Sequence, residues 1–174
     1  MKIESLSRLS ENKEELIALL NDCVENGASI GFLAPLQDGE ADSYWQGVAT
    51  DLAKGSRVLL VAREAEHIVG AIQIHYCTKT NGLHRANVEK LMVHSAFRRR
   101  GIALQLITEM ERQARTNQRT LLVLDSRTGD TASILYRKIG YHEVGQIPQF
   151  SRSTTGSTMD GTTFFYKLLS PFHH

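Results

Sequence analysis

A basic run followed by small residues, Arg98-Arg99-Arg100-Gly101-Ile102-Ala103, is the part of the sequence best suited to binding an anion. It follows an apolar segment of strand length and precedes a helical pattern, so it lies where a helix begins. The first turn of a helix has backbone N–H groups without partners inside the helix, and the helix dipole adds partial positive charge there. Gly101 and Ala103 carry little or no side chain, so a phosphate can approach the backbone closely. The segment therefore predicts a pyrophosphate site, with the arginines adding positive charge.

The same three arginines and glycine are equally compatible with a solvated basic helix start or a nucleic-acid patch. A nucleic-acid surface would show further basic and aromatic residues interleaved along the chain, together with a strong basic excess. The chain instead has 20 Lys and Arg against 19 Asp and Glu, which gives a formal net charge of +1. We therefore expect neither a nucleic-acid partner nor attraction to a membrane surface.

The elements that must position this segment alternate between strands and helices. Apolar runs predict strands at residues 3–6, 58–62, 68–76, 85–93, 120–124, 141–145 and 163–169. Helical spacing of apolar residues predicts helices at residues 11–24, 40–54, 102–115 and 130–139. Residues 151–161, rich in Ser, Thr and Gly, are expected to form a loop that either covers the site or merely connects two strands. This order predicts an α/β protein with a mixed sheet and helices on both faces.

Length and composition indicate one ordinary globular domain over residues 1–174. Hydrophobic residues make up 41% of the chain and charged residues 22%. The two cysteines, Cys23 and Cys77, lie in apolar patterns and are expected to be reduced. The sequence shows neither a signal peptide nor a run of about 18 apolar residues that could span a bilayer. We therefore expect a cytoplasmic protein without a membrane partner.

The basic segment resembles the cofactor motif of the GNAT superfamily of N-acetyltransferases, Gln/Arg-x-x-Gly-x-Gly/Ala, and residues 98–103 match it position for position. Leu91-Met92-Val93 resembles the strand ending that precedes this motif in the family. A second family element, a helix with a tyrosine before a glycine-aromatic pair, resembles the segment with Tyr136 and Gly140-Tyr141. The resemblance implies the GNAT fold, a mixed and mostly antiparallel sheet of about six to seven strands with helices on both faces.

The resemblance also implies acetyl-CoA as co-substrate and no metal. The residues that it implies for the cofactor are Leu91, Met92, Val93, Arg98, Arg99, Arg100, Gly101, Ile102, Ala103, Ser133 and Tyr136. Within the superfamily, residues 27–32, 81–93 and 124–125 most resemble the tabtoxin resistance type of acetyltransferase, which acetylates a β-lactam amino-acid toxin. Toxin resistance is therefore one expected role, and a homodimer is an assembly that the sequence leaves open.

A primary amine must lose a proton before it can attack a thioester, because its pKa is about 10. Glu89 and Asp125 are the candidate bases, with His94 a weaker one and water an alternative. Strict alternation along residues 85–93 puts Asn87, Glu89 and Leu91 on one face and Lys90 on the other. Tyr136 is implied by its family position to act as an acid toward the departing sulfur.

The acceptor is expected to be a small molecule with a primary amine, amino-acid-like or a β-lactam toxin. Candidate acceptor-binding residues are Phe32, Arg85 and Asn87. Of these, Arg85 can pair with a substrate carboxylate. Two alternatives remain open. The first is acetylation of a protein N-terminus or lysine, and the second is binding of coenzyme A without catalysis.

Overall fold

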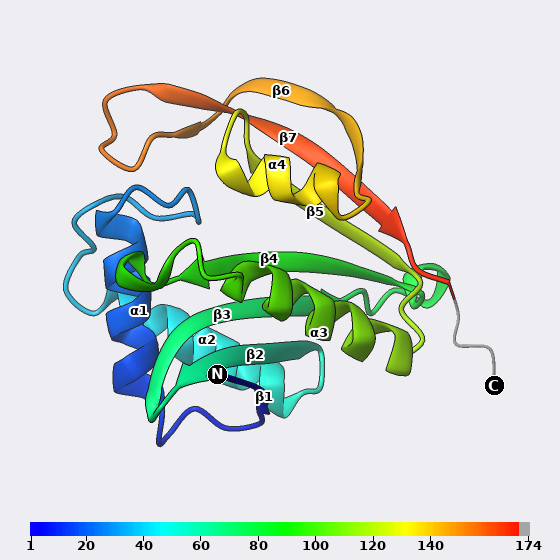
Figure 1. The fold of residues 1–174 in the computed structure, drawn as a ribbon, viewed down its shortest axis with the longest axis horizontal. Helices are drawn as coiled ribbons and strands as arrows, with labels where there is room; N and C mark the ends of the chain where they lie inside the picture. Colours follow the sequence, from blue (N-terminus) through cyan, green and yellow to red (C-terminus); the bar gives the residue numbers. More distant parts are fainter. Residues whose placement is uncertain (171–174) are drawn as a thin grey trace.

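The computed structural model describes residues 1–170 and contains one seven-stranded sheet with the strand order β1-β2-β3-β4-β5-β7-β6 (Figure 1). All neighbouring strands run antiparallel except β4 and β5, which are parallel. The strands are β1 Lys2–Leu6, β2 Arg57–Glu64, β3 His67–Tyr76, β4 Arg85–Val93, β5 Leu121–Arg127, β6 His142–Arg152 and β7 Met159–Leu168. The α/β fold expected from the sequence is confirmed, including the order of its helices and strands.

Two layers of helices cover the sheet, one on each face. The helices are α1 Lys13–Glu25, α2 Glu40–Ala53, α3 Ile102–Thr116 and α4 Thr131–Lys138. α1 and α2 share a buried cluster with Leu59 and Met92, whereas α3 and α4 share one with Leu60 and Val88. The amphipathic stripe expected on α3 is fully buried, from Ile102 to Ala114. Helices therefore cover both faces of the sheet, as the alternation of strands and helices along the chain predicts.

The end of the chain differs from the prediction in one respect. β6 runs from His142 to Arg152, not only to residue 145, so the expected loop at 151–161 shrinks to residues 153–158. β6 is an edge strand, mostly exposed, and its register with β7 shifts between Ile147 and Ser151. Polar residues and a proline are tolerated at such an irregular edge, and they hid the strand from pattern analysis.

β4 and β5 pair only at one end and then part. The parallel register covers Arg85 to Asn87 against Leu121 to Val123, and no pairing between the two strands continues beyond it in the described structure. Figure 1 shows the two strands diverging toward the side where the loop after α1 and the β6–β7 turn lie. From Val88 onward, the β5-facing edge of β4 is therefore open to a ligand.

A β-bulge interrupts β4 at Lys90, which has a φ of 53°. The register passes from Gln73↔Glu89 to Ala71↔Met92, so two residues of β4 lie opposite the single residue Ile72. Lys90 consequently points to the α1–α2 face, where its ammonium lies 5.5 Å from the Phe32 ring centroid. Strict alternation was therefore wrong beyond Glu89: Lys90 shares the face of Glu89, and Leu91 packs on the opposite cluster.

Candidate active site

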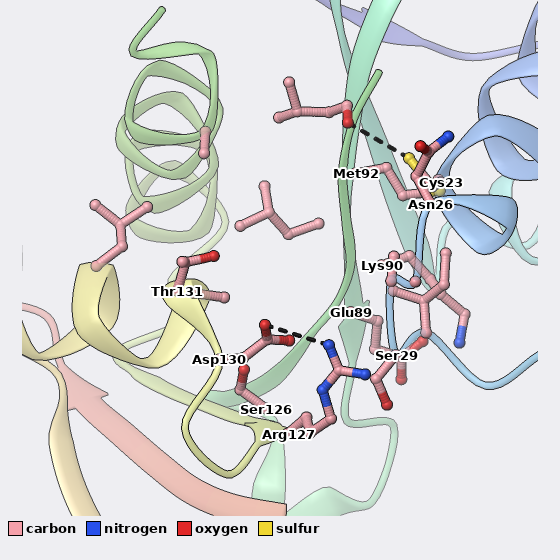
Figure 2. Close-up of a pocket in the computed structure, with 18 of the residues that line it drawn as sticks. Cys23, Asn26, Ser29, Glu89, Lys90, Met92, Ser126, Arg127, Asp130 and Thr131 are labelled. Carbon is pink, nitrogen blue, oxygen red and sulfur yellow. Dashed lines mark hydrogen bonds and ion pairs between the residues drawn. The ribbon is translucent and has the colours of Figure 1, made fainter. Parts of the chain in front are cut away.

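A groove of about 1040 Å³ lies between β4 and β5, where the two strands part. Its walls are the open edge of β4, the start of α3, the end of β5 and the start of α4. We call the part formed by residues 98–104 the α3 end, and the part formed by residues 28–33 and 150–152 the loop end. Figure 2 shows Glu89, Lys90 and Ser29 on one side of the groove, with Ser126, Arg127 and Asp130 facing them from the other side.

The α3 end offers mostly backbone. Gly101 is the N-cap of α3, with a φ of 76°, and no described side chain caps the helix. A Cβ at position 101 would meet no described protein atom within 4 Å, so the helix start faces open space. Free N–H groups, the positive end of the helix dipole and this lack of cover form an anion site.

The three arginines are not equivalent. Arg98 and Arg99 line the groove, as do Gly101 and Ala103. Arg100 does not line the groove. Its Nη1 lies 3.3 Å from Glu64 Oε2, and its guanidinium lies 4.9 Å from the Phe97 ring centroid. Only two of the three predicted arginines therefore face the groove with their side chains.

The open edge of β4 brings Leu91, Met92 and Val93 to the groove. The carbonyl of Val93 accepts a hydrogen bond from the Cys23 thiol at 3.6 Å, which Figure 2 shows as a dashed line. Burial raises the pKa of this thiol to about 11, so Cys23 stays protonated and unreactive. The remaining backbone groups of this edge can pair with the amides of an extended ligand.

Tyr136 projects from α4 into the groove wall between Tyr141 and Phe165, with ring centroids 5.3 Å and 5.9 Å away. Burial raises the pKa of its phenol, and the negative charge of Asp125 raises it further. Tyr136 therefore remains a neutral hydrogen-bond donor at physiological pH. Ser133, one turn earlier, is fully buried and donates to the Arg127 carbonyl at 3.3 Å, outside the groove lining.

The two predicted carboxylates line the same groove in different states. Asp125 is exposed near the end of β5, and its Oδ2 accepts a hydrogen bond from Thr162 Oγ1 at 3.0 Å. Glu89 is paired: its Oε2 lies 2.9 Å from Arg57 Nη1, and its Oε1 lies 3.9 Å from His75 Nδ1. Asp125 is thus held by a hydroxyl, whereas the Glu89 carboxylate forms an ion pair with a guanidinium.

The loop end is bridged by a contact between distant segments. The N–H of Ala34, in the loop between α1 and α2, donates to the carbonyl of Thr154 at 2.7 Å. Thr154 belongs to the β6–β7 turn and is buried there. The turn therefore rests on the α1–α2 loop, with Phe32 and Phe150 lining the groove beside it.

Two residues expected to bind the acceptor lie outside this groove. Arg85 sits at the paired end of β4, and its Nη2 donates to Cys77 Sγ at 3.3 Å. Asn87 is exposed and lies opposite His75 on β3. Both belong to the stretch where β4 and β5 are still joined, so neither borders the opening.

Sequence analysis missed Lys90, Thr162 and Arg127 as lining residues. Strict alternation placed Lys90 on the face opposite Glu89, so no residue pattern indicated that the two side chains share a face. Thr162 and Arg127 left no signal either, because their position depends on how β5 and β7 pair. Arg127 is loosely neutralised by Asp130 at 3.4 Å and Asp160 at 3.7 Å.

These features fit an adenine-nucleotide thioester such as acetyl-CoA: an anion site at one end, an open strand edge beside it, and a groove of suitable size. Within residues 1–170, no group of three or more His, Cys, Asp or Glu side chains is arranged to hold a metal ion. No helix in the same range is long and apolar enough to cross a membrane.

Comparisons with known proteins agree with this geometry. The family model described as an acetyltransferase (GNAT) domain matches residues 37–158. The L-methionine sulfoximine/L-methionine sulfone acetyltransferase of Pseudomonas aeruginosa is 24% identical over 157 residues, which cover 90% of this chain and 88% of that protein.

Solved structures share the fold over nearly the whole chain. The ribosomal-protein-alanine N-acetyltransferase of Brucella melitensis superposes with a TM-score of 0.81 at 24% identity, covering 97% of this chain and all (100%) of that one. A Salmonella typhimurium protein described as an acetyltransferase, solved with its cofactor acetyl-CoA, gives a TM-score of 0.76 at 17% identity, covering 100% and 96%. Because the family model spans more than half of the sequence, the chain belongs to the GNAT family of N-acetyltransferases.

Proposed function

We propose that this enzyme transfers the acetyl group of acetyl-CoA to the primary amine of a small, amino-acid-like molecule. The observation that carries the proposal is the bridge across the loop end, where the Ala34 N–H bonds to the Thr154 carbonyl. An acceptor at this end has to fit beside two joined segments, which favours a small amine over a protein terminus or a lysine on a protein surface. The relative from Pseudomonas aeruginosa, which acts on methionine sulfoximine and sulfone, supports the same class of acceptor.

Acetyl-CoA supplies an activated thioester. The backbone at the start of α3, together with Arg98 and Arg99, binds its phosphates in this proposal. The open edge of β4 pairs with its pantetheine arm, and a backbone N–H near Val93 stabilises the negative charge that develops on the carbonyl oxygen. Binding and orientation thus rest largely on main-chain groups.

Asp125 is the base that we favour for the acceptor ammonium, directly or through water. Its carboxylate is exposed in the groove and oriented by Thr162, whereas the Glu89 carboxylate already pairs with Arg57. A carboxylate that is engaged by a guanidinium is a poorer proton acceptor, because the ion pair stabilises its charged form.

Tyr136 is the donor to the departing sulfur. A phenol with an ordinary pKa of about 10 is a weaker acid than a thiol of about 8.5, and burial raises the Tyr136 pKa further. Complete proton transfer is therefore uphill, and Tyr136 acts through a hydrogen bond to the sulfur or through a proton that it regains at once.

The test is release of free thiol from acetyl-CoA with a panel of acceptors. The panel contains L-methionine sulfone, other α-amino acids, β-lactam amino acids, polyamines and aminoglycosides, together with peptides. We expect turnover with at least one small amine and none, or far less, with peptides.

Two results would contradict the proposal, and each has its own meaning. Turnover with peptides only would make the chain a protein acetyltransferase. Acetyl-CoA binding without turnover on any panel member would favour a binding role without catalysis.

A further inference from the structure

Because of the bulge in β4, the Lys90 side chain lies at the loop end of the groove. Regular alternation would have placed it on the opposite face of the sheet. Lys90 Nζ lies 5.5 Å from the Phe32 ring centroid and 5.7 Å from the Tyr44 ring centroid. The two rings meet edge to face at 5.3 Å and cover the ammonium from the α2 side. A Cβ added to Gly31 would lie 3.2 Å from the same nitrogen, so the loop before α2 also approaches it closely.

This ammonium has no anionic partner within residues 1–170. Arg57 pairs with Asp51 and Glu89, but Lys90 forms no hydrogen bond or ion pair with any described residue. Burial lowers its pKa, as expected for a half-buried cation that has lost water without gaining an anion. Glu89 and Asp125 favour its charged form from a distance, whereas Arg57 opposes it.

A half-buried charge normally has a partner, because desolvation without compensation is costly. The aromatic rings of Phe32 and Tyr44 compensate part of this cost through their π faces. They accept none of the three N–H donors in conventional hydrogen bonds, and Lys90 lines the groove, so a ligand bound there can supply an acceptor. The occupant of the groove is therefore the natural source of the missing anion.

We propose that Lys90 binds the carboxylate of the acceptor, which makes the substrate an α-amino acid or a close analogue. The proposal rests on the proposed small-molecule acetyltransferase function and narrows its substrate class. Lys90 takes the role that sequence analysis gave to Arg85, whose guanidinium lies outside the groove beside Cys77. Asp125 and Tyr136 line the same groove as Lys90.

The test compares two acceptors that differ only in the carboxylate, L-methionine sulfone and its decarboxylated analogue. Both are assayed by thiol release with the wild type and with Lys90→Met, Lys90→Arg and Lys138→Met. Lys138 is an exposed lysine on α4 outside the groove, so its variant controls for the loss of one positive charge. The quantity of interest is the ratio of kcat/KM for the two acceptors in each variant relative to wild type. In that comparison the intrinsic reactivities of the two amines cancel.

We expect Lys90→Met to lower kcat/KM for L-methionine sulfone by about 10- to 100-fold, the worth of one charged hydrogen bond. The decarboxylated analogue should change by less than about 3-fold, as for substitutions that touch no bound group. Lys90→Arg should recover part of the loss, because it keeps the charge but crowds Gly31. Acetyl-CoA affinity, measured by calorimetry, should stay at the wild-type value in all three variants.

Each other outcome has a defined meaning. An equal fall with both acceptors would show that Lys90 acts in catalysis or folding, and no fall with either would show that it is idle; both overturn the inference. If wild type acetylates small amines but no carboxylate-bearing ones, the inference fails and the proposed function stands. If wild type acetylates no small amine at all, the proposed function itself fails, and this inference fails with it.

Discussion

The two ends of the groove offer different kinds of groups to a ligand. At the α3 end, a run of consecutive residues presents backbone N–H groups at an uncapped helix start, and Gly101 leaves them uncovered. At the loop end, side chains converge from α2, β4, the loop before α2 and the end of β6. Backbone recognition depends on chain geometry, and side-chain recognition depends on residue identity.

This difference predicts which substitutions should weaken acetyl-CoA binding and which should change the choice of acceptor. Substitutions at the α3 end should weaken acetyl-CoA binding with every acceptor, because the cofactor site contains no acceptor contact. Substitutions at the loop end should change the choice of acceptor and leave acetyl-CoA affinity alone. Asp125 and Tyr136 lie between the two ends, where an effect on the chemical step is expected with neither binding constant changed.

The largest effects are expected at this junction. Tyr136→Phe and Asp125→Asn should each lower kcat by about 10²- to 10⁴-fold, since each removes a group that moves or shares a proton. Stopped-flow or steady-state thiol release gives kcat, and calorimetry should show acetyl-CoA affinity unchanged.

Glu89→Gln separates the two candidate bases. The amide still accepts a hydrogen bond from Arg57, so we expect a fall of only about 10-fold, below that of Asp125→Asn. A larger loss in Glu89→Gln than in Asp125→Asn would transfer the role of base to Glu89. An unchanged rate in Tyr136→Phe would remove the phenol from the mechanism.

A more selective effect, on cofactor affinity and not on the chemical step, is expected from Gly101→Val. The side chain would project into the open space at the start of α3 and keep phosphates from the N–H groups. We expect acetyl-CoA affinity to fall by about 10²-fold, the worth of one or two charged hydrogen bonds.

A matched control exists because Gly39 also caps a helix with positive φ. Its φ is 77° against 76° at Gly101, and a Cβ there likewise meets no described atom within 4 Å. Gly39 lies outside the groove, at the start of α2. Gly39→Val should lower the melting temperature about as much as Gly101→Val, yet leave acetyl-CoA affinity intact. Equal losses of affinity in both variants would mean that backbone strain, not steric exclusion, is responsible.

The α3 end could be read from the sequence because its parts are contiguous. Residues 98–103 lie between a strand and a helix, and the local pattern fixes both neighbours, so the position of Gly101 follows directly. The burial of the α3 stripe and the succession of the seven strands along the chain follow from the same local periodicity. Tyr136 was likewise recognised from its own segment.

The loop end could not be read in this way, and Lys90 shows why. One extra residue in β4 inverts the alternation of side chains, and no residue type marks the place where it is inserted. The place of Arg85 outside the groove could not be foreseen, because the point where β4 parts from β5 is set by pairing, not by β4 itself. Thr154 reaches Ala34 only because β6 is longer than its pattern predicts.

The smallest effect tests how firmly the junction is tied to the sheet. Thr162 is buried on β7, and its hydroxyl lies 3.0 Å from Asp125 Oδ2 and 3.1 Å from the Ser126 carbonyl. Thr162→Val keeps the shape of the side chain and removes the hydroxyl, so the Asp125 carboxylate loses its orienting donor. We expect kcat/KM to fall by about 3- to 10-fold, because the carboxylate stays in the groove and loses only one orienting contact. Thr162→Ser retains the hydroxyl and should recover most of the activity.

Because the contact touches neither end of the groove, acetyl-CoA affinity and the preference for carboxylate-bearing acceptors should both persist. A change in either would show that the two ends are coupled through β7, and the division between them would then have to be abandoned.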